Sequence, residues 1–330
     1  MAVAPIEASA PAPGGGGTLA PVEHEGLHRP SGRSGLGFAL AFSTVLLWAI
    51  LPLGLKIALQ GIDAMTLTWY RFSAAAAVLG VILALRGALP PLASLHRRHW
   101  RLLVVATTCL ATNYGCYVLG LDRTNASTSQ VVIQLAPMML ALGGVLVFQE
   151  RFGALQWVGL GTLMVGLLLF SHDQVVNMIE GLDRYYAGIG FLVVAGIAWA
   201  LYGLAQKQLL GRLPSPAIML CIYVGGAVIF APFARPAGIL DLSAIHAGAL
   251  LFCIVNMLLA YGTFSEALAH WEASRVSAVL AITPLVTLAV LRITDRAVPA
   301  LLAPEPISLV GLVGAVLVVA GSLLASLGKR

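Results

Sequence analysis

Polar side chains that could bind a small molecule recur at four-residue spacing inside otherwise apolar segments. Asn113 and Tyr117 stand four residues apart, and Gln130 and Gln134 repeat that spacing in the next apolar run. Residues four apart lie on one face of a helix, and polar groups within hydrocarbon are costly unless they face a protein interior. Such groups suit an uncharged or zwitterionic ligand of amino-acid size. We expect one shared cavity, lined by Trp48, Asn113, Tyr117, Gln130, Gln134, Trp199, Tyr202 and Asn256.

Each of these residues also has a purely structural interpretation. Asn and Gln side chains bridge helices within membranes, each hydrogen bond contributing about 0.6 to 2 kcal/mol. Aromatic side chains such as Trp48 and Trp199 fill volume or anchor helices at the interface. Arg71 lies inside another apolar run, where a buried guanidinium needs a partner that the sequence does not identify. Helix bridging stays open for any one residue, whereas the set as a whole favours a cavity.

Glu266 is the one acidic residue that we place within a predicted span. It shares a helical stripe with Asn256 and Thr263, and His270 follows one turn later. Burial disfavours the charged form of a carboxyl, so a buried Glu266 could take up and release protons, as residues of proton relays do in transporters. This interpretation makes Glu266 a coupling residue and the proton a candidate coupling ion. The alternative is a structural ion pair with Arg275 or His270.

Proline and glycine positions predict how the helices bend and pack. Pro137 and Pro284 each remove a backbone hydrogen bond within a predicted span, so each can bend its helix. We expect these bends to act in gating, with a fixed bend as the alternative. Gly159, Gly161 and Gly166 are expected to let two helix backbones approach closely.

Motifs of other protein classes are missing from the sequence. The cysteines all lie within apolar runs, which favours neither a disulfide framework nor a zinc site, and no phosphate-binding loop of the Gly-rich Lys-Ser/Thr type occurs. The candidate nucleophiles Ser127 and Ser277 have no His in a comparable position. We therefore expect no enzyme, no cofactor and no metal. A receptor or assembly protein stays as a further alternative.

Composition indicates a membrane protein. The chain of 330 residues is 59% hydrophobic and 10% charged, whereas soluble domains carry roughly 25% charged residues. Its net charge of +5 comes from basic residues between apolar runs rather than on one face, which argues against nucleic acid as a partner. Open strands leave amides unpaired in hydrocarbon. The sequence predicts an all-α integral membrane protein whose partner is the lipid bilayer.

The apolar runs after the first 35 residues are long enough to cross the membrane. About 20 residues span the roughly 30 Å of hydrocarbon, and short polar joints separate successive runs. Residues 1–35 are rich in Ala, Pro and Gly and are expected to be a disordered tail. The distribution of Lys and Arg among the joints predicts that both termini are cytoplasmic. We expect ten helices, over residues 36–56, 65–86, 101–121, 126–148, 153–171, 187–208, 216–234, 246–268, 275–294 and 307–327.

The two halves of the chain carry matching residues in the same order. Tyr114 and Tyr261 are followed by matching prolines at one offset of 147 residues, and Glu150 and Glu305 are each followed by glycines nine and sixteen residues later. Such ordered self-similarity indicates a duplicated unit.

The duplication predicts two five-helix repeats, over residues 36–171 and 187–327, joined by an extracytoplasmic linker at 172–186. Because five is odd, the second repeat must be inverted in the membrane relative to the first. Inverted repeats are typical of transporters that expose a midplane site alternately to each side. The oligomeric state is left open.

The pattern resembles that of EamA-type members of the drug/metabolite transporter superfamily. The matching features are Trp48 and Lys56 in the first span, Pro137 in the fourth, and Glu150 with the two spaced glycines after it. The resemblance covers residues 36–327. It implies ten helices in two inverted repeats, a bacterial inner-membrane location and usually export of a small metabolite. The resemblance does not identify the substrate; the amide and aromatic side chains of the predicted cavity favour an uncharged or zwitterionic one such as an amino acid, carried by secondary transport. An exporter of drugs or other cationic compounds is the alternative.

Overall fold

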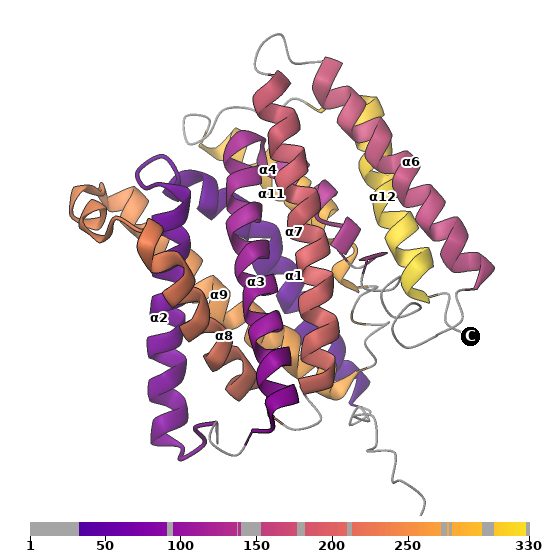
Figure 1. Ribbon diagram of the computed structural model, residues 1–330. Helices are drawn as coiled ribbons and strands as arrows, with labels where there is room; N and C mark the ends of the chain where they lie inside the picture. The colour runs from indigo at the N-terminus through magenta and orange to yellow at the C-terminus, as the bar shows by residue number, and fades with distance from the viewer. Residues whose placement is uncertain are drawn as a thin grey trace, which may run out of the picture.

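The computed structural model is a bundle of long helices standing side by side (Figure 1). Among the residues that it describes, all regular structure is helical. The described residues are 33–90, 95–136, 138–139, 153–176, 182–209, 213–271, 276, 279–298 and 307–327.

The first half of the chain contributes five labelled helices to the bundle. An acceptor side chain caps the start of three of them. Asp63 accepts hydrogen bonds from the N–H groups of Met65 and Thr66, His96 accepts one from Arg98, and Asn125 accepts one from Thr128. These helices are α1 (Ser34–Ala58), α2 (Ala64–Leu85), α3 (Arg97–Arg123), α4 (Ala126–Val132) and α6 (Ala154–Val176).

The second half begins with α7, which starts inside the segment predicted as a linker. The helices of the second half are α7 (Leu182–Leu209), α8 (Ser215–Phe230), α9 (Ala244–His270), α11 (Thr283–Ala297) and α12 (Leu309–Leu327). Two short 3-10 turns, η2 (Ala231–Phe233) and η3 (Pro236–Asp241), follow α8.

The predicted all-α membrane class is confirmed. Six described helical segments are long and apolar enough to cross a membrane, namely α1, α2, α3, α7, α9 and the continuous segment of α8 and η2. The helices α6 and α12 carry shorter apolar stretches. The described part of the chain does not show ten full spans. One reason is that α4 ends at Val132 and α11 begins only at Thr283, each beside a turn in the middle of a predicted span.

Helices from the two halves of the chain pack against each other in pairs. The closely packed pairs are α1 with α9, α3 with α7, α2 with α8, and α6 with α12. Figure 1 shows α6 and α12 together at one edge of the bundle. The core is therefore built between the halves, so neither half buries its apolar faces alone.

Glycines bring α6 and α12 into backbone contact. A Cβ atom on Gly166 would lie 2.7 Å from the carbonyl oxygen of Gly314, and one on Gly321 would lie 2.6 Å from that of Gly159. The close approach expected at Gly159 and Gly166 is confirmed. For Gly161 the expectation is wrong, because it points away from α12 and a Cβ there would meet nothing within 4 Å.

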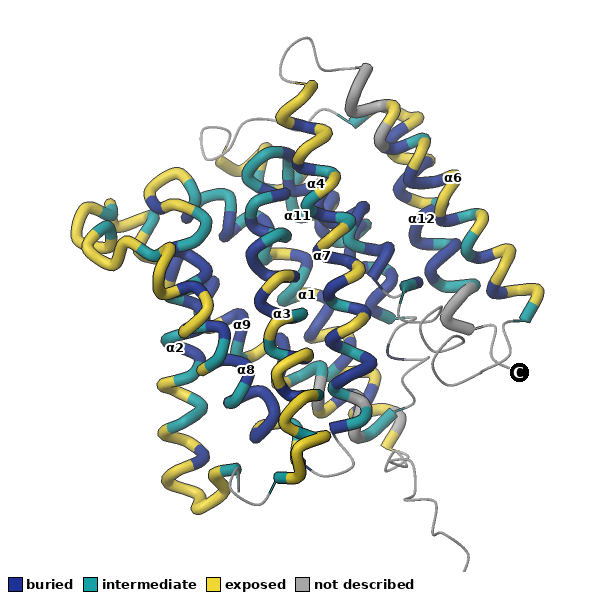
Figure 2. The backbone as a smooth tube through the Cα atoms, in the orientation of Figure 1, coloured by how far each residue is buried: buried dark blue, intermediate teal, exposed yellow. Residues whose placement is uncertain are grey.

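The outer surface of the bundle is apolar. Exposed positions run along the outward faces of the helices (Figure 2), and large hydrophobic side chains occupy many of them, including Val81 on α2, Leu168 on α6 and Val228 on α8. An apolar exterior of this extent is unfavourable in water. It suits hydrocarbon as the surrounding solvent.

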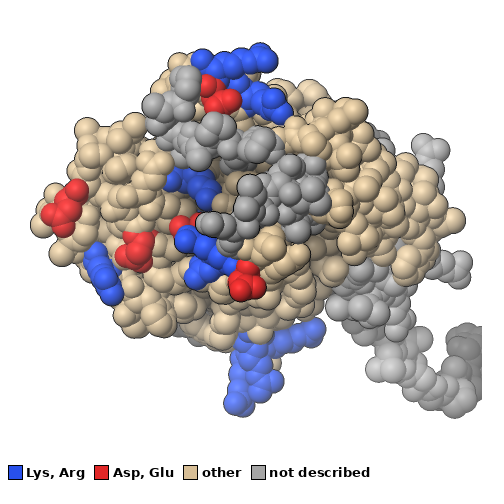
Figure 3. Space-filling model, turned by 90° about the horizontal axis from the view of Figure 1, so that it is seen from above, with Lys and Arg blue, Asp and Glu red and all other residues tan. Residues whose placement is uncertain are grey.

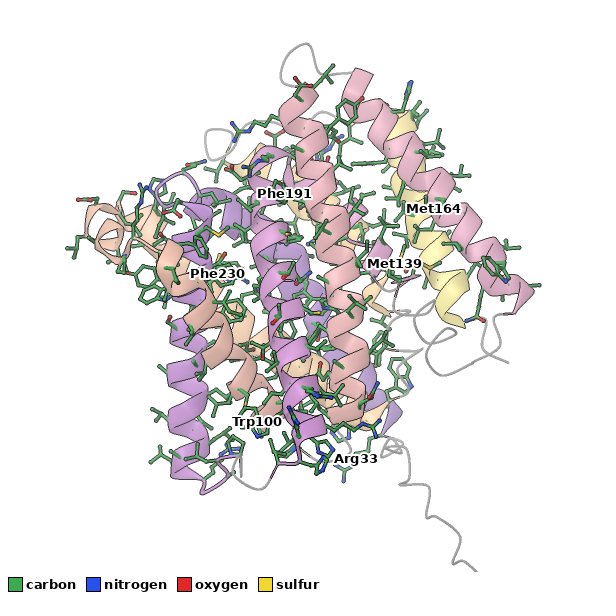
Figure 4. All side chains as sticks on the ribbon, in the orientation of Figure 1. Arg33, Trp100, Met139, Met164, Phe191 and Phe230 are labelled. Carbon is green, nitrogen blue, oxygen red and sulfur yellow. The ribbon has the colours of Figure 1, made fainter. Side chains whose placement is uncertain are left out.

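Charged side chains also lie at the ends of the helices. Figure 3 looks onto one end, where charged side chains are scattered among uncharged ones. Arg184 forms an ion pair with Asp122 (3.2 Å), and Lys56 donates to the carbonyl of Thr124 (2.7 Å). Arg33 and Trp100 lie together at one end and Phe191 lies toward the other (Figure 4), as the predicted topology requires for the starts of α1 and α3.

Candidate substrate cavity

A cavity of about 140 Å³ lies inside the bundle, between helices of both halves. A cavity of ~150 Å³ holds one benzene molecule, so this space suits a molecule of about that size. Its lining combines aromatic rings, three amide side chains and one guanidinium. The lining residues are Trp48, Leu51, Arg71, Asn113, Tyr114, Tyr117, Gln130, Ile133, Gln134, Ala136, Trp199, Tyr261, Leu280 and Thr283.

Most of the residues predicted to share a cavity do so. Six of the eight line it, namely Trp48, Asn113, Tyr117, Gln130, Gln134 and Trp199.

Tyr202 and Asn256 are placed elsewhere, so for these two the predicted position is wrong. Tyr202 is buried in the apolar core, where its hydroxyl donates to the sulfur of Met219 (3.4 Å). Asn256 is also buried and donates through Nδ2 to the carbonyl of Leu47 (2.7 Å). Asn256 thus bridges two helices, as the structural alternative expected.

Sequence reasoning left out Arg71, Tyr114, Tyr261 and Thr283 as lining residues. A signal for the two tyrosines was present, because they occupy matching positions in the two halves. In the structure their rings lie 6.1 Å apart, and the Trp48 ring lies 5.8 Å from that of Tyr261. These rings form a continuous aromatic wall.

Pro52 explains why Gln130 is needed in the bundle. It lies inside α1 and has no N–H, so the carbonyl of Trp48, four residues earlier, lacks its helical donor. The Nε2 of Gln130 donates to that carbonyl at 2.8 Å. In a membrane such a freed carbonyl requires another donor.

The carbonyls on either side of Trp48 are held in the same way. That of Leu47 accepts from Asn256 on α9 (2.7 Å), and that of Ala49 accepts from Thr287 on α11 (3.0 Å). Side chains from three other segments therefore meet one turn of α1. This turn forms part of the cavity wall and is fixed by polar contacts.

Removing the Gln130 donor is expected to destabilise the protein. Gln130→Leu leaves the Trp48 carbonyl buried without a partner, which costs about 1 to 3 kcal/mol. The midpoint of thermal unfolding in detergent should fall. Thr162→Val is the control, because the Thr162 hydroxyl donates to the carbonyl of Val158 within the same helix, at an exposed position. An equal fall in both variants would contradict the proposed role of Gln130.

The helices are interrupted beside the cavity at matching places. Turns occupy 133–134 after α4 and 281–282 before α11. The Nε2 of Gln134 donates to the carbonyl of Ala281 at 3.0 Å, and these two residues are 147 positions apart in the chain. Discontinuous helices near the midplane supply binding groups in many transporters.

The prolines predicted to bend these spans have different outcomes. Pro284 lies in the first turn of α11, which begins at Thr283. Its missing N–H would have no helical partner at that position, so a bend inside a continuous helix is the wrong description. Pro137 lies outside the described residues. Gating by either proline stays a prediction.

Arg71 brings a positive charge to the cavity. Only 1% of its surface is exposed, and its Cζ lies 4.9 Å from the centroid of the Tyr114 ring. The Nε and Nη2 atoms have no hydrogen-bond partner among the described residues. The ring face supplies a cation–π contact, but it leaves these donors unsatisfied.

Glu266 lies away from the cavity. Its side chain is 65% exposed, its carboxylate is 3.8 Å from Nε2 of His270, and it follows the apolar stretch Ala244–Phe264 of α9. The expected burial of this carboxyl is therefore wrong, since the apolar stretch ends before the residue. Within the described ranges, no group of three or more His, Cys, Asp or Glu side chains could hold a metal ion.

Apolar helices around a cavity lined by polar groups are an architecture that suits a membrane transporter. The model of the EamA-like transporter family matches residues 35–172 and 186–327. The chain belongs to this family.

Relatives of similar length agree with this assignment. The chain is 36% identical over 299 residues to the "Uncharacterized inner membrane transporter YhbE" of Escherichia coli K12, which covers 90% of this chain and 93% of the relative. It is 33% identical to an "Uncharacterized transporter" of Haemophilus influenzae, over 89% of this chain and 96% of the relative. These similarities support a multi-pass inner-membrane transporter.

A distant relative and a solved structure add to the comparison. The "Probable amino-acid metabolite efflux pump" of Escherichia coli K12 is 24% identical over 62% of this chain and 69% of its own length. A solved structure titled "Crystal structure of protein" matches 90% of this chain and 98% of its own with a TM-score of 0.63 at 17% identity. That structure shows the fold alone.

Proposed function

We propose that the protein is a secondary transporter that exports a small zwitterionic or uncharged metabolite, such as an amino acid, by alternating access. The observation that carries this proposal is the cavity beside the two helix interruptions, with amide groups from the first half and aromatic rings from both halves in its wall. A site between two similar halves is accessible from either side when the halves rock against each other.

Helix pairing supports an arrangement of two inverted repeats. If the halves exchange places, α1 becomes α7 and α9 becomes α3, so the pair α1 with α9 becomes the pair α7 with α3. The pairs α2 with α8 and α6 with α12 map onto themselves, and all four pairs are present. The hydrogen bond from Gln134 to Ala281 joins equivalent positions, as expected near a twofold axis.

Cavity size and charge support a small substrate that is not a cation. About 140 Å³ leaves space for roughly a benzene-sized group. Arg71 would repel a cationic ligand placed in this cavity, where charges interact more strongly than in bulk water. The cationic-drug alternative is therefore disfavoured. The distant similarity to the amino-acid metabolite efflux pump agrees with a small metabolite.

Transport by purified protein in proteoliposomes tests the proposal. Vesicles loaded with unlabelled small neutral amino acids should accumulate the labelled compound by counterflow, whereas protein-free vesicles should not. A lipophilic cation in the same assay serves as the competing substrate. Counterflow of the cation alone would replace the proposed function with drug export, and no counterflow of either would contradict secondary transport of both classes.

The variant Glu266→Gln distinguishes a role of this residue in proton coupling from a role in a structural ion pair. The exposure of its carboxyl and its contact with His270 favour the ion pair, so we expect Glu266→Gln to keep both counterflow and gradient-driven accumulation. Accumulation at several pH values measures the difference. Loss of accumulation with counterflow retained would assign coupling to Glu266 and would make the proton the coupling ion.

A further inference from the structure

Arg71 is a buried charge with two donors that no described residue satisfies. Its side chain is almost fully buried on α2, and neither Nε nor Nη2 meets an acceptor among the described residues. The two ion pairs seen there, Arg184 with Asp122 and His270 with Glu266, do not involve it. A guanidinium stays charged at any physiological pH, so protonation changes cannot relieve its burial.

The Tyr114 ring accounts for one face of the guanidinium and not for its edge. The distance of 4.9 Å from Cζ to the ring centroid indicates a cation–π contact. The N–H groups lie in the plane of the guanidinium and require acceptors beyond that ring. A ligand in the adjoining cavity is well placed to provide them, because Arg71 lines it.

The charge balance of the cavity selects the ligand group. Among the described residues that line the cavity, Arg71 is the one that carries a charge, so one carboxylate on the ligand would neutralise the guanidinium, and the ammonium of an amino acid would be left to face the aromatic rings. The planar fork of an arginine matches the two oxygens of a carboxylate in a bidentate contact. A phosphate monoester carries close to two negative charges and would leave one unbalanced. The site therefore favours a monocarboxylate.

The remaining lining suits the other end of such a ligand. Trp48, Trp199 and Tyr261 offer apolar and ring-face contacts, and Gln130 and Gln134 add amides. We propose that Arg71 anchors the carboxylate of the transported molecule, so that the substrate is a small monocarboxylate such as a neutral amino acid. The inference rests on the proposed function and specifies the chemistry of its substrate.

The test compares carboxylates with their amides. Glycine, L-alanine and L-valine, each with its carboxamide and with the matching fatty acid anion, are added to purified protein, and binding is measured by the shift of thermal unfolding. We expect at least one carboxylate to stabilise the wild type and its amide to bind about 100-fold more weakly, because the amide leaves the charge unpaired. Equal binding of the amides, or stabilisation by none of the carboxylates, would overturn the proposal.

Arg71→Met separates a ligand anchor from a structural residue without any transport assay. Removing an unpaired buried charge should leave the ligand-free unfolding temperature equal or higher and should abolish the carboxylate shift. A lower temperature would show that Arg71 is paired within the protein and would overturn the anchor. Arg123→Met is the matched control, since Arg123 lies 5.0 Å from the Phe191 ring outside the cavity; it should keep the carboxylate shift.

Counterflow distinguishes failure of the anchor from failure of the proposed function. If Arg71→Met still exchanges an amino acid at the wild-type rate, transport stands and the anchor is wrong. If carboxylate binding depends on Arg71 but no counterflow occurs, the anchor stands and transport is wrong.

Discussion

Replacing Gly166 with valine is expected to prevent α6 and α12 from packing. A Cβ at this position would lie 2.6 Å from the backbone nitrogen of Val318 and 2.7 Å from the carbonyl of Gly314, and valine adds two methyl groups beyond it. Backbone atoms cannot move aside as a flexible side chain can, so overpacking should cost about 3 kcal/mol. The yield of monodisperse protein and the unfolding midpoint in detergent measure the effect.

Gly161→Val is the matched control for this prediction. It makes the same change on the same helix, where a Cβ would meet nothing within 4 Å. We expect wild-type yield and stability from this variant. Equal stability of the two variants would show that α6 and α12 do not touch at Gly166.

Filling the cavity should abolish transport while leaving the protein folded. Ala136 is buried and lines the cavity, and Ala136→Phe adds a phenyl group of about the size that ~150 Å³ accommodates. The group would occupy the space meant for substrate. Counterflow should fall by at least about 100-fold, since the ring takes up most of the cavity, and any strain should stay near the ~1 to 3 kcal/mol typical of overpacking.

Ala77→Phe tests whether the loss depends on position. Ala77 is exposed on α2, so the added ring should extend into lipid and leave counterflow unchanged. Size-exclusion profiles of both variants establish that they are folded. Retained counterflow in folded Ala136→Phe would mean that substrate passes elsewhere.

The sequence predicted which residues share a helix face better than it predicted which neighbouring element that face contacts. Spacing of four residues correctly placed Asn113 with Tyr117 and Gln130 with Gln134 at one cavity. Spacing alone does not say which neighbour a face meets, and this is why Asn256 contacts α1 instead of the cavity. A comparison of matching positions would also have identified Tyr114 and Tyr261, which are equivalent in the two halves and both line the cavity.

Errors at charged residues have a different cause. The sequence predicts a span that includes Glu266 and therefore a buried carboxyl, whereas the apolar stretch of α9 ends at Phe264. Arg71 was recognised as needing a partner, but a partner that is a ligand leaves no residue pattern in the chain. The effect of Pro52 cannot be predicted from its neighbours in the sequence, because the donor to the Trp48 carbonyl that it frees is Gln130, 82 residues away.

The glycine contacts between α6 and α12 have the form of an isologous interface. Gly166 meets Gly314, and Gly159, the counterpart of Gly314, meets Gly321, the counterpart of Gly166. Two copies of one chain make such reciprocal contacts across a twofold axis. Here both surfaces belong to a single polypeptide, so the association is intramolecular, gains from a high effective concentration and does not depend on how much protein the membrane contains.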